Sequence, residues 1–295
     1  MPTLKENFEF DLRGYLIIPK FLSEEKAEEL NTALEATNGH GVKLPFLLSH
    51  PDWLGILSDP RILQYCAAWI GPKFRFDHGW AVQHPPGDDS HQNMHGGPLS
   101  SEGMFDYTYR QGSPRTSCLV LGIALKEQPA GKGGVVFIPG SHKSNVSNKR
   151  VLKELYAETD TSAYSSTLVH TPVMRPGDAV LFTEALVHGT KSWTHTDWRR
   201  NCYLKYCLPS SGWIPQNDPE IVELRGLAKT GVQSRLLAES YLASKTYNVA
   251  PRWRADVLNI EPKNNIAPRP KVKPHQNPTK TPPKLQCKTS IKSTL

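Results

Sequence analysis

Three side chains in the middle of the chain have the chemistry to bind a metal ion or an acid. His95 stands in the glycine-rich stretch HQNMHGGP, His188 in FTEALVHGT and Arg199 in DWRRNCYLKY. Imidazole is a common metal ligand, and a guanidinium can hold a carboxylate through two parallel hydrogen bonds. Each residue taken alone also has an ordinary structural explanation, so its meaning depends on the elements that position it.

Those elements are expected to be mainly strands. From residue 73 onward, short apolar runs are broken by Gly and Pro, which is typical of an antiparallel sandwich or barrel. Strands are expected at 14–19, 73–84, 116–125, 133–141, 166–174, 178–189 and 199–208, and helices at 23–37, 57–70 and 217–244. The sequence therefore predicts one mainly β domain with flanking helices over residues 1–260.

The last part of the chain, residues 261–295, has a different composition. Eight Lys or Arg and no acid lie within 262–295, so the overall charge of +7 leaves about −1 for the rest of the chain. Seven prolines and few apolar residues make this a basic tail that is expected to be disordered. Because the domain itself is nearly neutral, no specific nucleic-acid partner is expected.

Composition also indicates a cellular location. No apolar run is long enough to span a membrane, and the start MPTLKENFEF lacks the order of a secretory signal. The five cysteines form no CxxC pair, which favours reduced thiols over disulfides or structural zinc. We expect a cytoplasmic protein without a transmembrane segment. Its oligomeric state is not indicated.

Taken together, the motifs resemble a known family. The order HGGP, GGVVFIPGSHKSN, GDAVLFTEALVHGT and then Arg199 is similar to the phytanoyl-CoA dioxygenase (PhyH) family of iron(II)- and 2-oxoglutarate-dependent oxygenases, in particular its HGGP-bearing branch. The resemblance covers about residues 8–260. It implies a double-stranded β-helix, the cupin-like jelly roll. His142, in the stretch IPGSHKSN, is expected to have a structural role.

The resemblance also implies roles for particular residues. His95 and His188 would be the two histidines that bind Fe(II), and Arg199 with Thr190 would hold the cosubstrate 2-oxoglutarate. Arg200 would point to the opposite face of its strand. The reaction implied is the O2-dependent hydroxylation of a small organic substrate, with release of succinate and CO2.

The sequence departs from the family pattern at one position. Two residues after His95, where the family has an acid, this chain has Gly97. One alternative places the metal-binding carboxylate at Glu184, which stands among apolar residues and could instead form a salt bridge. A second leaves the position open for a halide, as in related iron halogenases. A third shifts the motif to His91 and Asn93. The fourth is a binding or scaffold protein without metal chemistry.

Overall fold

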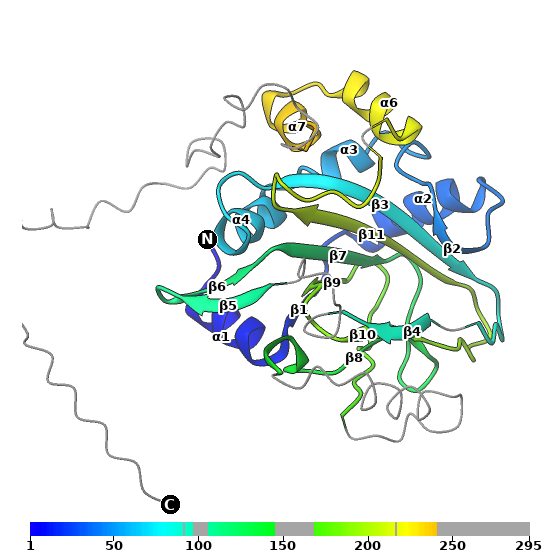
Figure 1. The fold of residues 1–295 in the computed structure, drawn as a ribbon. Helices are drawn as coiled ribbons and strands as arrows, with labels where there is room; N and C mark the ends of the chain where they lie inside the picture. Colours follow the sequence, from blue (N-terminus) through cyan, green and yellow to red (C-terminus); the bar gives the residue numbers. More distant parts are fainter. Residues whose placement is uncertain (91, 97–105, 145–167, 216, 241–295) are drawn as a thin grey trace, which may run out of the picture. The chain divides into compact units, whose positions relative to one another are not determined.

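A computed structural model of the chain describes residues 1–90, 92–96, 106–144, 168–215 and 217–240 (Figure 1). The helices are α1 Leu4–Arg13, α2 Glu24–Glu35, α3 Trp53–Ile56, α4 Pro60–Trp69, α6 Pro219–Leu227 and α7 Gly231–Leu236. The strands are β1 Tyr15–Ile18, β2 Gly41–Leu44, β3 Arg75–His84, β4 Gln92–His95, β5 Tyr107–Arg110, β6 Ser113–Thr116, β7 Cys118–Ala124, β8 Gly134–Phe137, β9 Ala179–Thr183, β10 His188–Lys191 and β11 Arg199–Cys207.

Two antiparallel sheets form the centre of the fold. The larger has the order β1-β9-β7-β11-β3-β2 and the smaller the order β4-β10-β8, while β5 and β6 form a separate hairpin. An apolar cluster that includes Val82, Val120, Phe137 and Phe182 packs between the two sheets. This architecture confirms the predicted mainly β fold.

Helices cover the other face of the larger sheet. In Figure 1, α2, α3, α4, α6 and α7 lie on the side away from the smaller sheet. Their side chains, among them Leu30, Trp53 and Leu63, pack against the outward residues of the strands, such as Leu121 and Leu204. Because side chains alternate along a strand, one face of the larger sheet belongs to this core and the other to the site.

Three expected elements differ from those observed. The run 178–189 was expected as one strand but forms β9 and β10, because the chain turns after Thr183 and crosses to the smaller sheet. Of the expected strand 166–174, the structure describes residues 168–174, and these form only isolated bridges, at His170 and Met174. The expected helix at 217–244 is interrupted between α6 and α7.

A helix that the sequence interpretation missed, α1, begins at a capping box. Thr3 Oγ accepts a hydrogen bond from the Glu6 backbone N–H, and the Glu6 side chain accepts one from the Thr3 backbone N–H. Within the described ranges, no helix is long and apolar enough to cross a membrane. The cysteines of this part of the chain are free thiols, and all of them are buried: Cys66, Cys118, Cys202 and Cys207.

Candidate active site

A cavity of about 630 Å³ opens between the two sheets. The larger sheet contributes His78, Trp80 and Lys205 to its lining, and the smaller sheet contributes His95 and His188. The remaining lining residues are Pro45, Gly79, Val82, Val135, Phe182, Glu184, Gly189, Thr190, Tyr203, Trp213, Ile214, Asp218, Glu220 and Ile221. All three of the predicted metal-binding residues, His95, His188 and Glu184, thus share one cavity with Thr190.

His95 and His188 are direct partners across the antiparallel strands β4 and β10, with ring centroids 4.2 Å apart. The Nδ1–H of His188 donates to the carbonyl oxygen of Leu186 at 2.7 Å, which leaves Nε2 as the nitrogen with the lone pair. Burial, followed by the proximity of His95, lowers the pKa of His188 to about 4. A neutral imidazole with a backbone-fixed tautomer is the form that binds metal ions.

Gly96 lets the end of β4, the strand that carries His95, approach the turn between β9 and β10. Its φ is +110°, and a Cβ atom there would lie 2.5 Å from the Leu186 carbonyl oxygen and 2.8 Å from that of Glu184. Any larger residue at position 96 would force β4 away from the turn between β9 and β10, which explains why the first residue after His95 in HGGP is a glycine. His91 and Gly97 lie outside the described residues, as does the Asn93 side chain, so the shifted-motif alternative stays a prediction.

Glu184 follows β9 and lines the cavity, but its carboxylate has a partner. Its Oε1 lies 2.9 Å from Lys205 Nζ, and both side chains are less than a tenth exposed. Burial would raise the pKa of Glu184, yet Lys205 and then His188 outweigh burial and lower it. The salt bridge considered as one alternative for Glu184 is therefore present, and its role as a metal ligand stays a prediction.

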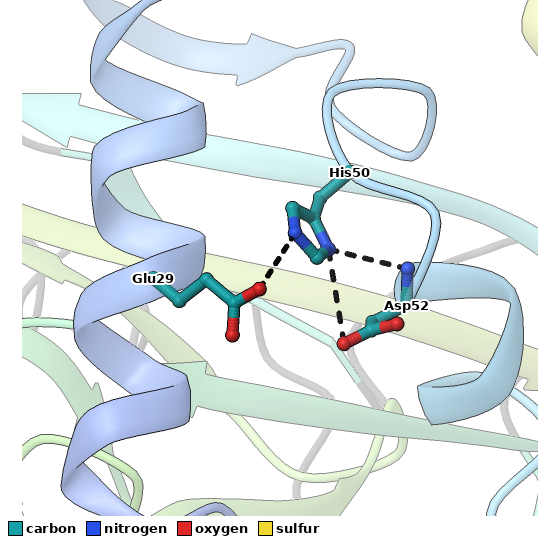
Figure 2. A group of neighbouring side chains, drawn as sticks. All are labelled: Glu29, His50 and Asp52. Atoms are coloured by element: carbon teal, nitrogen blue, oxygen red, sulfur yellow. Dashed lines mark hydrogen bonds and ion pairs between the residues drawn. The ribbon is translucent and has the colours of Figure 1, made fainter.

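A second candidate cluster lies on the surface. Within the described ranges, one group of three potential ligands has its atoms within 4.8 Å of one another, namely Glu29, His50 and Asp52 (Figure 2). The Lys26 ammonium contacts both carboxylates, which are about half exposed. An ammonium among these carboxylates takes the place that a cation would need, so this cluster is an ion-pair network.

Arg199 points to the inner side of the larger sheet and is fully buried. Its Nε donates to Asn201 Oδ1 and its Nη2 to Tyr203 Oη, each at 3.1 Å, so Arg199 lies directly behind the cavity-lining Tyr203. Its Nη1 has no hydrogen-bond partner among the residues that the structure describes. A buried guanidinium nitrogen without an acceptor is costly, and it suits an anionic ligand.

Arg200 lies on the opposite face, as the alternation along the strand predicts. Its guanidinium donates to Gln83 Oε1 at 2.9 Å, to Asn31 Oδ1 at 3.2 Å and to Glu35 Oε1 at 3.1 Å. Both contacts with α2 help to fix that helix on the sheet. Arg200 is therefore structural, and Arg199 is the arginine on the inner face.

His142 is also structural in its surroundings. It is buried, its Nε2 lies 3.1 Å from the Asp11 carbonyl oxygen, and its ring meets Tyr107 edge to face. Burial lowers its pKa to about 4. It fixes the segment after β8 against the end of α1 and does not line the cavity.

Comparison with known proteins places this architecture in a family. The family model for phytanoyl-CoA dioxygenase (PhyH) matches residues 45–201, more than half of the chain. The chain belongs to the PhyH family. No curated protein sequence matches it.

Solved structures confirm the fold of this PhyH-family chain. HygX from Streptomyces hygroscopicus with iron bound is 22% identical, covers 70% of this chain and 87% of its own, and has a TM-score of 0.62. EctD from S. alaskensis with bound Fe is 18% identical, covers 71% and 78%, and has a TM-score of 0.55. The carbocyclase SnoK from nogalamycin biosynthesis is 17% identical, covers 71% and 85%, and has a TM-score of 0.52. The predicted cupin-like jelly roll is therefore confirmed.

The sequence interpretation missed several polar residues around Arg199 in this PhyH-family chain. Gln128, Asn201 and His84 are each buried, and each has a side-chain nitrogen without a hydrogen-bond partner in the described part of the chain. Asn201 could have been found, because it is two residues after Arg199 and must share its face. Gln128 lies in a loop and carries no comparable signal.

Proposed function

We propose that this PhyH-family protein is an iron(II)- and 2-oxoglutarate-dependent oxygenase that hydroxylates a small organic substrate. The observation that carries the proposal is a facing histidine pair in the cavity lining together with a buried arginine, Arg199, bound to the lining residue Tyr203. The Nη1 of Arg199 has no hydrogen-bond partner in the described part of the chain. A metal needs neutral imidazoles and an acidic cosubstrate needs a fixed cation. The buried His188, whose pKa is lowered to about 4, offers a neutral imidazole, and the buried Arg199 offers the cation.

The donor set fits iron. His95 and His188 would hold the ion, and His188 is already oriented by its hydrogen bond to Leu186. Glu184 also lines the cavity and would supply a carboxylate ligand either by leaving Lys205 or by contacting the ion and Lys205 together. Bound iron and 2-oxoglutarate supply the activation of O2, with formation of succinate and CO2.

The protein's own residues would bind and orient the cosubstrate. Arg199 would pair with the carboxylate remote from the metal, and the Thr190 hydroxyl would add a further hydrogen bond. Thr190 is buried and lies on β10 two residues after His188, so both side chains face the cavity. One extended diacid would then reach from the histidines towards Tyr203 and Arg199.

The remaining part of the cavity would receive the substrate. Trp80 and Trp213 offer aromatic surface there. His78 offers its Nε2, since its other ring nitrogen, Nδ1, is held by the Asp77 carboxylate at 2.6 Å. Aromatic walls with a few fixed polar groups suit a small organic molecule. HygX has been crystallised with nickel, 2-oxoglutarate and hygromycin B, which supports a small-molecule substrate here.

Hydroxylation is the proposed outcome of the reaction. Other structures with this fold are named for different outcomes, the carbocyclase SnoK and the epimerase SnoN. The pairing of Glu184 with Lys205 favours a second form of the site, in which the third metal position is open to an external ligand such as a halide. Chloride dependence of metal binding separates the two forms.

Anaerobic titration with Fe(II) and 2-oxoglutarate tests the proposal. The wild-type protein should develop the weak visible charge-transfer band of the iron chelate. The band should be lost in His188→Ala and weakened in Arg199→Gln, while Arg200→Gln, the matched change on the outer face, should retain it. A wild-type protein that develops no band would instead be a binding or scaffold protein on the same fold.

A further inference from the structure

We propose that Gln128 and Asn201 are cosubstrate-binding residues, whose side-chain amides complete with Arg199 a cradle that selects a 2-oxo acid carrying a second, distal carboxylate. The proposal rests on the proposed function and deepens it. It assigns the choice among 2-oxo acids to three buried nitrogen donors instead of to the arginine alone.

The orientation of Asn201 is fixed by the arginine itself. Its Oδ1 accepts a hydrogen bond from Arg199 Nε at 3.1 Å, so the carbonyl side of the amide faces the guanidinium. The amide nitrogen Nδ2 must then point elsewhere, and it has no partner among the described residues. Asn201 is fully buried, so bulk water does not satisfy this donor.

Gln128 reaches the same place from a loop. Its backbone is paired twice with Met174, at 2.8 and 3.1 Å, which holds the loop in position. A Cβ atom on Gly134 would lie 2.7 Å from Gln128 Oε1 and 3.6 Å from Arg199 Nε, so both side chains meet beside this glycine. The Gln128 Nε2 is buried and has no partner within the described ranges.

His84 belongs to the surroundings of Arg199 but not to the donors. Its Nδ1 lies 2.5 Å from the Asp88 carboxylate, and burial lowers its pKa, so the neutral ring carries its hydrogen on Nδ1. Its Nε2 is then an acceptor. Around Arg199, the donors without an acceptor in the described part of the chain are Arg199 Nη1, Gln128 Nε2 and Asn201 Nδ2.

Three such donors are matched by one carboxylate. Its two oxygens can accept about four hydrogen bonds, and the guanidinium favours an anion over a neutral group. Leaving the donors unpaired would cost free energy for each buried group. Arg199 donates to the lining residue Tyr203, so in this proposal a diacid chelated at the metal would direct its far carboxylate towards Tyr203 and the cradle.

The test compares binding of two ligands to full-length protein loaded with Mn(II) in the absence of oxygen. 2-Oxoglutarate has the distal carboxylate, whereas 2-oxopentanoate has the same chain length without it. The variants Asn201→Asp and Gln128→Glu each replace a donor nitrogen by an anionic oxygen. Gln83→Glu makes the same change beside Arg200 on the outer face and serves as control, since Gln83 Oε1 accepts from Arg200 there.

Asn201→Asp and Gln128→Glu should each weaken 2-oxoglutarate binding by about tenfold or more, with 2-oxopentanoate and Mn(II) affinities unchanged. Gln83→Glu should change none of them. Gln128→Met, an uncharged variant, should act in the same direction if Gln128→Glu fails to fold. Folded variants that bind 2-oxoglutarate as the wild type does would show that the amides hold only a buried water. A wild type that binds Mn(II) but not 2-oxoglutarate would overturn the proposed function as well.

Discussion

Replacing Lys205 by Met removes the cation that neutralises Glu184 inside the cavity. The two groups are 2.9 Å apart and their side chains are 8% and 6% exposed, so Glu184 would be left as an unpaired buried carboxylate. Removing one partner of a buried pair costs about 3–5 kcal/mol. Because the pair lines a cavity that admits water, we expect the lower end, about 3 kcal/mol.

This loss can be measured as a change in melting temperature. For a domain of this size about 2–4 °C corresponds to 1 kcal/mol, so Lys205→Met should lower Tm by about 6–12 °C in metal-free buffer. Glu184→Gln should cost less, since Lys205 keeps its contact with the Trp213 ring, 4.4 Å from Nζ. The double variant should be more stable than the sum of the single changes predicts.

Lys126→Met is the matched control. Lys126 lies 3.5 Å from the half-exposed Asp197, a surface pair whose loss should cost at most about 1 kcal/mol. A Tm for Lys205→Met that equals that of Lys126→Met would refute the view that Lys205 neutralises Glu184 in a buried site.

Metal addition then identifies the role of Glu184. With Lys205 removed, the carboxylate of Glu184 is free to bind a metal ion. If Glu184 is a ligand, Mn(II) should therefore bind Lys205→Met more tightly than wild type. At about 100 times Kd, binding stabilises by about 2.7 kcal/mol, enough to restore most of the lost Tm. Equal Mn(II) affinity in both proteins would contradict a ligand role and favour the site with an open third position.

Three further predictions concern the surroundings of the site. Gly96→Ala should lower Tm and weaken Mn(II) binding, because its Cβ would meet the Leu186 carbonyl oxygen at 2.5 Å, whereas Gly87→Ala, with nothing within 4 Å, should have little effect on metal binding. Burial lowers the pKa of His142 from 6.5 to about 4, so this residue favours folding above pH 6.5 and loses that contribution as the pH falls towards 4. Between pH 6.5 and pH 4, the Tm of His142→Phe should therefore fall less than the Tm of the wild type. Deletion of 262–295 should leave Tm and 2-oxoglutarate binding unchanged, and a large loss of either would contradict a separate tail.

Strand alternation made much of the inner face predictable. A two-residue period places Arg199 and Arg200 on opposite faces, and the structure has them there, with Arg200 bound to α2. The same period would have included Asn201. The strand positions of His95 and His188 could be inferred from motifs, but their pairing in register depends on the glycine at 96, whose close approach only the structure shows.

Contacts between distant segments could not be predicted from the sequence, for a physical reason. The run containing Glu184 looks like one apolar strand, and the turn that divides it depends on which sheet each half can pair with. Once the chain turns, Glu184 meets Lys205 from a different strand of the larger sheet. Local periodicity carries no information on that pairing. The sequence alone therefore left two alternatives for Glu184, a metal ligand and a salt-bridge partner.

The same turn connects the questions of metal and cosubstrate. It brings Glu184 and His188 into the lining of the cavity, while Arg199 lies behind the lining residue Tyr203. Arg199 is fixed by Asn201 and Tyr203 without any ligand, whereas Glu184 is held by a cation that a metal ion would displace or leave in place. The proposed cosubstrate-binding end is therefore preorganised, and we expect the choice of third metal ligand to depend on the strength of one ion pair. The affinity of Mn(II) for Lys205→Met measures that choice directly.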